Sequence, residues 1–141
     1  MQSAVVLDDL KFDLELFKVY DGAKQCPINF TLNVIGNKFA FLILRNMIYF
    51  KQNRFNQFLN SIEDINTKAL TNRLKDLEHN GLIKRRIFNE HPVKIEYHLT
   101  SRGLALKPLL DMMASYSLTY FDKNVKDGKK RTLSQIIKNG K

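Results

Sequence analysis

The 141-residue chain has few of the residues from which disulfide frameworks and metal sites are built, with one cysteine, three histidines and no tryptophan. A single cysteine cannot form an intramolecular disulfide, and this scarcity is typical of proteins in a reducing compartment. The histidines are scattered rather than placed at zinc-ligand spacing, so we expect neither a metal nor another cofactor. These absences favour an intracellular, cytoplasmic protein.

Long apolar runs are also missing from the sequence. No run approaches the roughly 18 apolar residues that a membrane span needs. The N-terminus lacks the basic-then-apolar order of a signal peptide. We therefore expect no membrane partner, in keeping with the cytoplasmic assignment.

Motifs for catalysis are missing as well. The sequence has no glycine-rich phosphate loop, no nucleophile elbow and no pair of histidines at metal spacing. His79 falls at a predicted helix end, His91 in a predicted turn and His98 on the polar face of a predicted strand. We interpret each histidine as an ordinary surface residue, so the chain is not expected to be an enzyme.

What the chain has in excess is positive charge, with a formal net charge of +9. Residues 1–25 hold five acids and three bases, whereas residues 66–98 hold seven bases and four acids. Residues 121–141 hold seven bases and two acids. A basic surface of this kind favours nucleic acid or an anionic membrane as partner. Because the signals for a membrane are missing, nucleic acid is the preferred interpretation.

Residues 66–81 are predicted to form one amphipathic helix, around which the rest of the chain is organised. Leu70, Leu74 and Leu77 recur at positions i, i+4 and i+7 and form one apolar stripe. An asparagine or threonine at the start can cap the helix, and a glycine ends it. The opposite face carries charged, hydroxyl and amide side chains, namely Lys68, Thr71, Asn72 and Lys75.

The elements before this helix predict a helix-turn-helix. A short helix is expected after Pro27, because proline suits the first helical position. A largely buried helix follows over 38–49, then a short helix over 55–61 and a tight turn over 62–65. A short helix, a tight turn and an amphipathic helix in this order form a helix-turn-helix.

After Gly81 the periodicity changes from that of a helix to that of a strand. Residues 82–88 and 93–99 are predicted to form two strands, and apolar and polar residues alternate in the second. A polar tip over 89–92 joins them into a basic hairpin. A helix-turn-helix followed by such a hairpin is a winged helix, so the predicted fold class is α+β, mostly α.

A last long helix is predicted over 101–120, with a bend near Pro108 because proline removes one backbone hydrogen bond. Beyond the proline, apolar side chains form a stripe wider than a single small domain can cover. Burying it against a second copy would contribute about 25 cal/mol per Å² of apolar area, before association costs. The alternative is that the helix completes its own core. The predicted dimer interface comprises Leu109, Met112, Met113, Tyr116 and Tyr120.

The chain accordingly divides into four parts. Residues 1–25 form an acidic N-terminal extension. Its apolar spacing fits a strand or a helix about equally, and a helix at the dimer interface is slightly preferred, with a loosely held segment as the alternative. Residues 26–100 form the winged helix-turn-helix DNA-binding domain. Residues 101–120 form the C-terminal dimerisation helix, and residues 121–141 form a basic tail that adds non-specific affinity for phosphate.

The predicted DNA contacts lie on the recognition helix, about 67–80, and on the hairpin, or wing, about 83–99. The N-terminal half of such a helix reads base edges, where asparagine pairs with adenine and lysine reaches guanine or phosphate. Arg73 lies beside the leucine stripe, so either a phosphate or an acidic partner within the fold would suit it. Arg85 and Arg86 point to opposite faces of a strand and cannot contact DNA equally. The candidate DNA-binding residues are Thr67, Lys68, Thr71, Asn72, Arg73, Lys75, Arg85, Arg86 and Lys94.

Several separated motifs together resemble one known family. In order and spacing, residues 26–120 resemble the HxlR-type transcriptional regulators, a winged-helix family related to MarR. Phe39 stands where that family usually has tryptophan, and the wing tip has only His91-Pro92 in place of a longer proline-rich stretch. The motifs are CP at 26–27, LNVIGNK at 32–38, LILR at 42–45, RFN at 54–56, LTNRLKDLEHNGL at 70–82 and IEYHLTSRG at 95–103.

The resemblance implies a prokaryotic regulator of transcription that binds pseudo-palindromic double-stranded DNA as a homodimer, with its N- and C-terminal helices at the dimer interface. It also implies a redox effector as a candidate partner, since some members sense oxidants or electrophiles through a cysteine near the position of Cys26. The apolar region near the dimer interface offers a place for a small-molecule effector. A helix N-terminus there would stabilise a thiolate, although a buried small apolar residue is the preferred interpretation. Two alternative functions are a winged helix that binds another protein and an architectural protein that binds DNA non-specifically.

Overall fold

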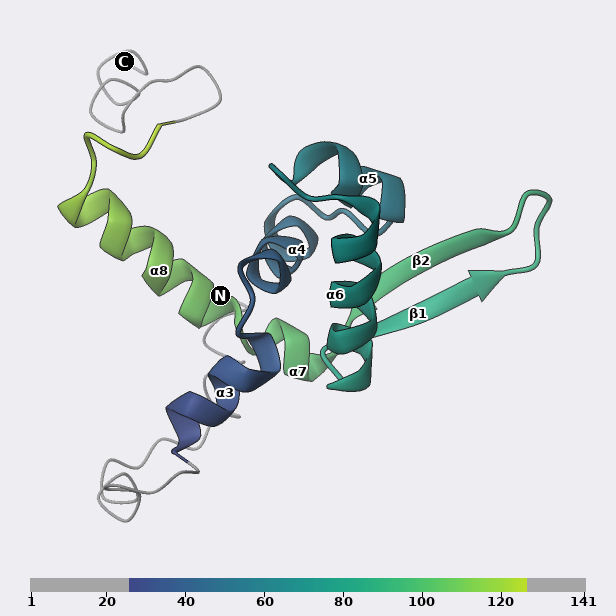
Figure 1. The fold of residues 1–141 in the computed structure, drawn as a ribbon, viewed down its shortest axis with the longest axis horizontal. Coiled ribbons are helices and arrows are strands. Elements are labelled where there is room, and N and C mark those ends of the chain that lie inside the picture. The colour runs from purple at the N-terminus through teal and green to yellow at the C-terminus, as the bar shows by residue number, and fades with distance from the viewer. Residues whose placement is uncertain (1–25, 127–141) are drawn as a thin grey trace. The chain divides into compact units, whose positions relative to one another are not determined.

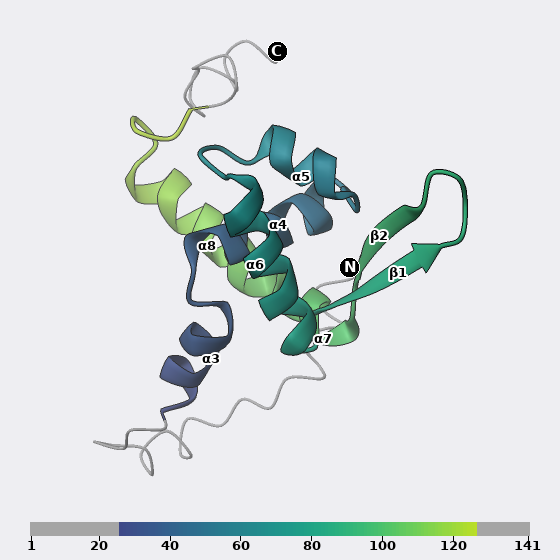
Figure 2. The ribbon, with the colours of Figure 1, turned by 45° about the vertical axis from the view of Figure 1, so that its right-hand side comes forward.

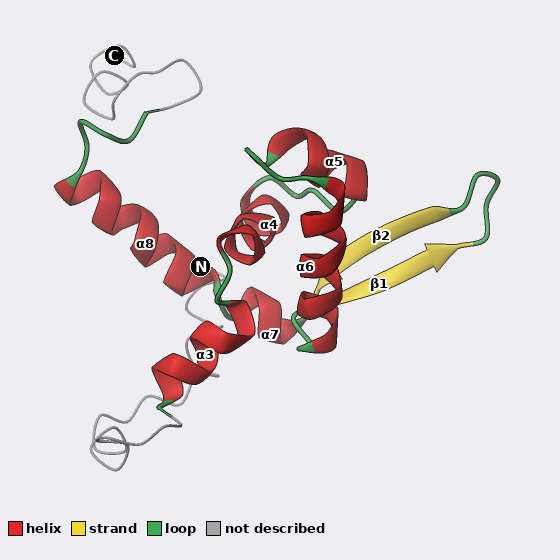
Figure 3. Ribbon diagram, in the orientation of Figure 1, coloured by secondary structure: helices red, strands yellow, loops and turns green. Residues whose placement is uncertain are grey.

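The computed structural model describes residues 26–126, so the predictions for residues 1–25 and 127–141 lie outside the described residues. The chain divides into two compact units, residues 1–107 and 108–141, and each is described on its own. Helices predominate, with one small sheet (Figure 3). The elements are α3 (Pro27–Ile35), α4 (Lys38–Tyr49), α5 (Phe55–Ser61), α6 (Thr67–His79), β1 (Ile83–Phe88), β2 (Lys94–Leu99), α7 (Ser101–Leu104) and α8 (Lys107–Tyr120) (Figure 1).

The core of the first unit lies among α4, α5 and α6 and at the start of β1. Ile43, Leu44, Phe58, Leu70 and Leu77 are all 0% exposed. Two views show α6 beside α4 and α5, with the β-hairpin extending from the C-terminal end of α6 (Figures 1 and 2). This arrangement confirms the predicted order of short helix, turn and amphipathic helix, followed by a wing.

Helix α6 is delimited at both ends by the residues that the sequence pattern indicated. The side chain of Asn66 accepts a hydrogen bond of 2.8 Å from a backbone N–H of the first turn. At the other end Gly81 has a φ of 76°, in the left-handed region that glycine adopts without strain. The N–H of Leu82 donates to the carbonyl of Leu77 at 2.9 Å, and that of Gly81 donates to Glu78 at 3.0 Å. These two bonds form a Schellman motif, which ends the helix and turns the chain into the wing.

A buried amide joins α4, the following loop and α5. Asn46 is 0% exposed, and its Nδ2 donates to Gln52 Oε1 and to Ser61 Oγ, each at 2.9 Å. Its Oδ1 accepts a bond of 2.8 Å from Arg45 Nε. Buried polar groups are costly unless they are hydrogen-bonded, and here the amide is satisfied on both sides. The network fixes the loop between α4 and α5.

The wing is a two-stranded antiparallel sheet whose base is anchored to this loop. The N–H of Tyr97 donates to the carbonyl of Asn53 at 2.8 Å. The Tyr97 ring packs edge-on against the buried ring of Phe58, with 6.3 Å between the ring centroids. One face of the wing base is therefore fixed to the body of the unit, whereas the tip projects away from it (Figure 1).

The single helix predicted over 101–120 is in fact two helices. Helix α7 ends at Leu104, and α8 begins at Lys107 after a turn. Pro108 occupies the second position of α8, where its missing N–H has no intrahelical partner to lose. The interruption lies near Pro108 as predicted, but it is a full break rather than a bend.

Helix α3 is buried only at its C-terminal end. Ile35 is 1% exposed, whereas Ile28 and Leu32 are 59% and 50% exposed. Within residues 26–126, much of the apolar side of α3 is thus left uncovered.

Among residues 26–126, no single helix is long and apolar enough to cross a membrane. Helices α3 and α4 reach the required length and composition only as a pair, which is bent by 79°. The apolar side chains of α4 are largely buried in the core of the first unit.

Candidate nucleic-acid interface

The outward side of α6 carries the polar residues that the sequence analysis selected. With about 100° between successive residues of a helix, the buried Leu70, Leu74 and Leu77 define the inner side. Thr67, on one flank at the start of the helix, is exposed, and Thr71 on the same flank is half-buried. Four exposed residues lie on the outer side and are called the reading face: Lys68, Asn72, Lys75 and His79.

Arg73 lies on one flank of α6 and has an acidic partner within the fold. Its Nη2 lies 3.0 Å from Oδ2 of Asp76, one turn along the helix. The Nε of Arg73 is buried and has no hydrogen-bond partner among residues 26–126. The sequence left phosphate and an internal acid open for this residue. The structure shows the internal ion pair, with one donor of the guanidinium still unused.

Strand register separates the side chains of the wing onto two faces. Directly opposite residues of an antiparallel pair share a face, and faces alternate along a strand. Arg85 pairs with Tyr97 and therefore lies on the inner face, which meets the body of the unit at its base. Arg86 pairs with Glu96 on the outer face. The two arginines thus lie on opposite faces, as the alternation indicated.

The outer face of the wing is cationic. Its residues are Lys84, Arg86, Phe88, Lys94, Glu96 and His98, with Glu96 as the one acid among them. Lys94 Nζ lies 3.2 Å from Glu96, and His98 Nε2 lies 2.9 Å from the same carboxylate. The hydrogen bonds from His98 and Lys94 hold the pKa of Glu96 below its ordinary value. The carboxylate therefore stays charged and orients both neighbours.

An aromatic ring orders the cations at the tip end of the outer face. The ammonium of Lys94 and the guanidinium of Arg86 each lie 5.4 Å from the centroid of the Phe88 ring. A cation at this distance is attracted by the ring quadrupole. The ring and Glu96 together hold these long side chains beside one another on a surface that can follow a phosphate backbone.

The inner face connects the wing to α6. Arg85 Nε lies 4.0 Å from Glu78, and both side chains are partly exposed. Burial raises the pKa of the neighbouring Tyr97 hydroxyl. Part of the charge of Arg85 is therefore balanced within the fold, which leaves it less available to DNA than Arg86.

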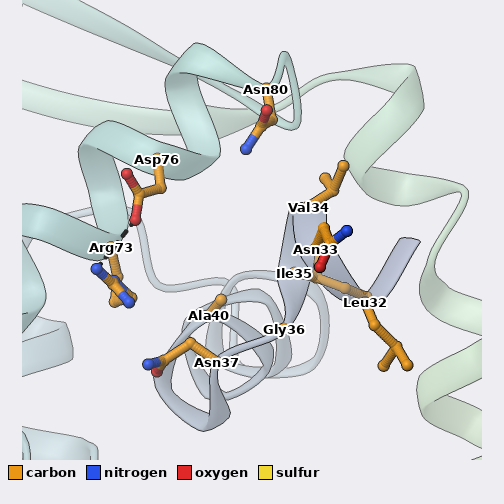
Figure 4. Close-up of a pocket in the computed structure, with 10 residues that line it drawn as sticks. All are labelled: Leu32, Asn33, Val34, Ile35, Gly36, Asn37, Ala40, Arg73, Asp76 and Asn80. Atoms are coloured by element: carbon orange, nitrogen blue, oxygen red, sulfur yellow. Dashed lines mark ion pairs between the residues drawn. The ribbon is translucent and has the colours of Figure 1, made fainter. Parts of the chain in front are cut away.

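A pocket of about 410 Å³ lies between the end of α3 and the flank of α6 that carries Arg73 (Figure 4). The Arg73–Asp76 ion pair and Asn80 line it from α6, and the turn at Gly36 lines it from the other side. Its walls are largely polar. The pocket shows that the α6 flank facing α3 and α4 is not closed by apolar packing.

Helix α8 exposes all five side chains of the predicted dimer interface. Leu109, Met112, Met113, Tyr116 and Tyr120 are between 40% and 71% exposed in the single chain. The rings of Tyr116 and Tyr120 lie against each other, with 5.3 Å between their centroids. A patch of this composition on one helix is typical of a surface that another protein covers.

The described residues contain no group of three or more His, Cys, Asp or Glu that could hold a metal ion. Cys26 is half-buried at the residue before α3 and makes no side-chain capping bond there. Its role as a redox sensor stays a prediction.

Two residues of these surfaces were not among the candidate DNA-binding residues, although Lys84 was counted in the basic hairpin. Lys84 lies on the outer face of the wing with Arg86 and Lys94, and His79 completes the reading face. The signal for Lys84 was the period of two along β1, and the signal for His79 was its spacing of four from Lys75 and seven from Asn72. Both spacings can be read from the sequence when the bounds of β1 and α6 are known.

The comparison with known families settles which winged helix this is. The model of the HxlR-like helix-turn-helix family matches residues 34–125, which include α4, the helix-turn-helix, the wing and α8. The chain belongs to the HxlR-like helix-turn-helix family. The resemblance drawn from the motifs is thereby confirmed.

Relatives in this family are similar over most of their length. YybR of Bacillus subtilis, an uncharacterized HTH-type transcriptional regulator, is 36% identical over 98 residues, covering 70% of this chain and 78% of YybR. Another, sll1512 of Synechocystis, is 40% identical over 89 residues, covering 62% of this chain and 64% of sll1512.

Solved structures show the same fold. The redox regulator HypR in its oxidised form has a TM-score of 0.63 and 35% identity, covering 69% of this chain and 99% of HypR. The transcriptional regulator YodB from B. subtilis, in its reduced form, has a TM-score of 0.60 and 28% identity, covering 72% of this chain and 99% of YodB. The winged helix-turn-helix predicted from the sequence is therefore confirmed.

Proposed function

We infer that this HxlR-family protein is a transcriptional regulator that binds double-stranded DNA sequence-specifically as a homodimer. The observation that carries this inference is the reading face of α6. Three buried leucines fix the helix, while Lys68 and Asn72 project from its first turns. An α-helix fits the major groove of B-DNA, and these side-chain types form bidentate bonds to guanine and adenine edges.

The wing supplies contacts that hold the protein on the duplex. Its outer face presents three cations, Lys84, Arg86 and Lys94, against one acid. Phosphate contacts fix register and orientation without carrying sequence information. A reading helix beside a cationic hairpin therefore combines base recognition with backbone binding.

The apolar surface of α8 supports the dimer. Its five exposed apolar side chains would be buried by a second copy, which removes a patch that water disfavours. Two recognition helices related by a twofold axis would then enter successive major grooves about 34 Å apart. The operator is accordingly expected to be a pseudo-palindrome with half-sites about one helical turn apart.

Selection of bound fragments from a random DNA pool, followed by fluorescence anisotropy with the selected duplex, tests this function. We expect an enriched pseudo-palindrome and an affinity that falls steeply with salt, by about 0.9 in log K per log unit of salt for each phosphate contact. A pool without enrichment would point to an architectural protein. A flat salt response would point to a winged helix that binds another protein.

A further inference from the structure

A groove of about 320 Å³ runs along α6 on the flank away from the wing. Asn37 and Phe39, from the start of α4, form one wall, and Asn66, Lys68, Asn72 and Arg73, from the start of α6, form the other. None of the residues that line this groove is acidic. Three amide side chains and two cations therefore surround a space that opens beside the reading face.

A third cation, Lys38, lies beside the aromatic residue that lines the groove. The ammonium of Lys38 lies 5.7 Å from the centroid of the Phe39 ring, which itself lines the groove. The exposed Lys38 side chain is thus held over the aromatic wall instead of extending freely into solvent. Lys38 is the first residue of α4, and Lys68 is the second residue of α6.

One residue that lines the groove, Arg73, has a hydrogen-bond donor without a partner among residues 26–126. Its Nη2 is engaged by Asp76 at 3.0 Å, while its buried Nε has no partner among the described residues. Buried donors are rarely left unpaired, because an unsatisfied donor has lost its hydrogen bonds to water. Asp76 pairs with the guanidinium without lining the groove, so no carboxylate is among the residues that an anion seated there would meet.

The groove lies on the side of α6 opposite the wing, and this position indicates that the anion is a phosphate of DNA. On α6, Arg73 and Glu78 are five residues apart and lie on the two sides of the reading face. The Glu78 side joins the wing through Arg85, whereas the Arg73 side forms the groove. A helix in the major groove is bordered by a phosphate backbone on each side, so the wing and this groove each face one strand.

We propose that this groove seats a phosphate of the DNA strand opposite the one followed by the wing, with Lys38, Lys68 and Arg73 as its cationic ligands. The start of α4 thereby becomes a third DNA-binding element beside the recognition helix and the wing. The inference rests on the proposed DNA-binding function and adds to it a contact made from outside the helix-turn-helix.

Replacement of Lys38 tests whether its side chain contacts a DNA phosphate. Lys38→Gln should reduce the slope of log K against log salt by about 0.9 for each subunit on the DNA. It should also weaken binding to the selected operator and to unrelated duplex by the same factor. The matched control is Lys51→Gln at the opposite end of α4, which should leave both the slope and the affinity unchanged. Circular dichroism checks that both variants fold.

A set of modified duplexes locates the phosphate itself. Single phosphates of the selected operator are replaced one at a time by neutral methylphosphonates. At one position in each half-site, wild type and Lys38→Gln should bind equally, because the partner of Lys38 is already uncharged. The proposal is overturned, and the proposed function stands, if wild type binds with steep salt dependence and either of two results is found. Either Lys38→Gln matches Lys51→Gln on the unmodified operator, or Lys38→Gln stays weaker than wild type on every modified duplex. If wild type itself shows no salt-dependent binding, both fail.

Discussion

Asn46 Nδ2 donates to Ser61 Oγ over 2.9 Å, which joins the C-terminal half of α4 to the end of α5 through a side chain that is 0% exposed. The Ser61 hydroxyl also donates to the Gln57 carbonyl, at 2.6 Å. The loop that this network fixes leads into α5 and contains Asn53, whose carbonyl holds the wing. The orientation of the DNA-binding elements thus depends on one buried amide.

Replacing Asn46 by alanine should destabilise the fold. The change leaves the partners of the amide unsatisfied and opens a small cavity, at a cost of about 1–3 kcal/mol. Urea denaturation should show a lower midpoint with an unchanged slope. Asn56→Ala, on the exposed side of α5, is the matched control and should lie within about 0.5 kcal/mol of wild type. Equal stability of the two variants would contradict the role of the network.

Two replacements on the reading face should have different effects. Asn72→Ala should weaken operator binding by about 1–3 kcal/mol while binding to unrelated DNA is nearly unchanged, because it removes a base contact. Lys68→Gln should weaken both, because it removes a charge that the proposed groove directs at a phosphate, whereas Asn72, which also lines the groove, is uncharged. Anisotropy titrations with operator and unrelated duplex measure both effects. Asn124→Ala, an exposed amide after α8, serves as control. Loss of both affinities on Asn72→Ala would assign that residue to the backbone instead.

Substitution of the two arginines of β1 should show which face of the wing contacts DNA. Arg86→Gln on the outer face should reduce the salt slope by about 0.9 for each bound subunit. Arg85→Gln should reduce it less, because Arg85 lies on the inner face, 4.0 Å from Glu78. The pair is its own matched control, since the chemistry is identical and the positions are adjacent. The reverse ranking would mean that the inner face lies against DNA.

The ion pairs of Glu96 should make part of the stability depend on pH. Its pKa is lowered in the folded state, chiefly by the hydrogen bond from His98 and then by that from Lys94. A lowered folded-state pKa contributes stability that is present above the unfolded value, about 4.3, and is lost as pH falls through the folded value. Thermal unfolding of wild type and Glu96→Gln should therefore differ near neutral pH and converge in acid. A difference in Tm that is constant from neutral to acidic pH would show that packing, not ionisation, is responsible.

Local sequence patterns were sufficient to predict the helices and strands. They were insufficient to predict the surfaces that form where two of these elements pack together. The leucine spacing, the Asn66 cap and Gly81 define α6 because each acts within a few residues. The phosphate groove was not predicted, because Phe39 and Arg73 become neighbours only through the packing of α4 on α6. Arg73 was ambiguous in the sequence for the same reason.

For the C-terminal helix, the surface was predicted from the sequence, but the helix boundary and the partner of that surface were not. The spacing of its apolar residues indicated the stripe that α8 exposes. The break before α8 was expected only as a bend, because a proline predicts that a helix is interrupted but not where the next one starts. What covers the stripe depends on a second molecule, which no local pattern specifies.

A single charge within this stripe should therefore dissociate the proposed dimer. Met112 and Tyr116 lie one turn apart on α8 and are 67% and 58% exposed in the single chain. Met112→Asp places a carboxylate in what would be an apolar interface, where burying an unpaired charge costs several kcal/mol. Analytical ultracentrifugation should show a monomer for Met112→Asp.

Ala114→Asp adds the same charge on the other side of α8, at an exposed position, and should remain a dimer. Operator affinity should fall with the first variant only, because two linked recognition helices bind far more tightly than one. A Met112→Asp protein that stays dimeric would move the interface away from α8.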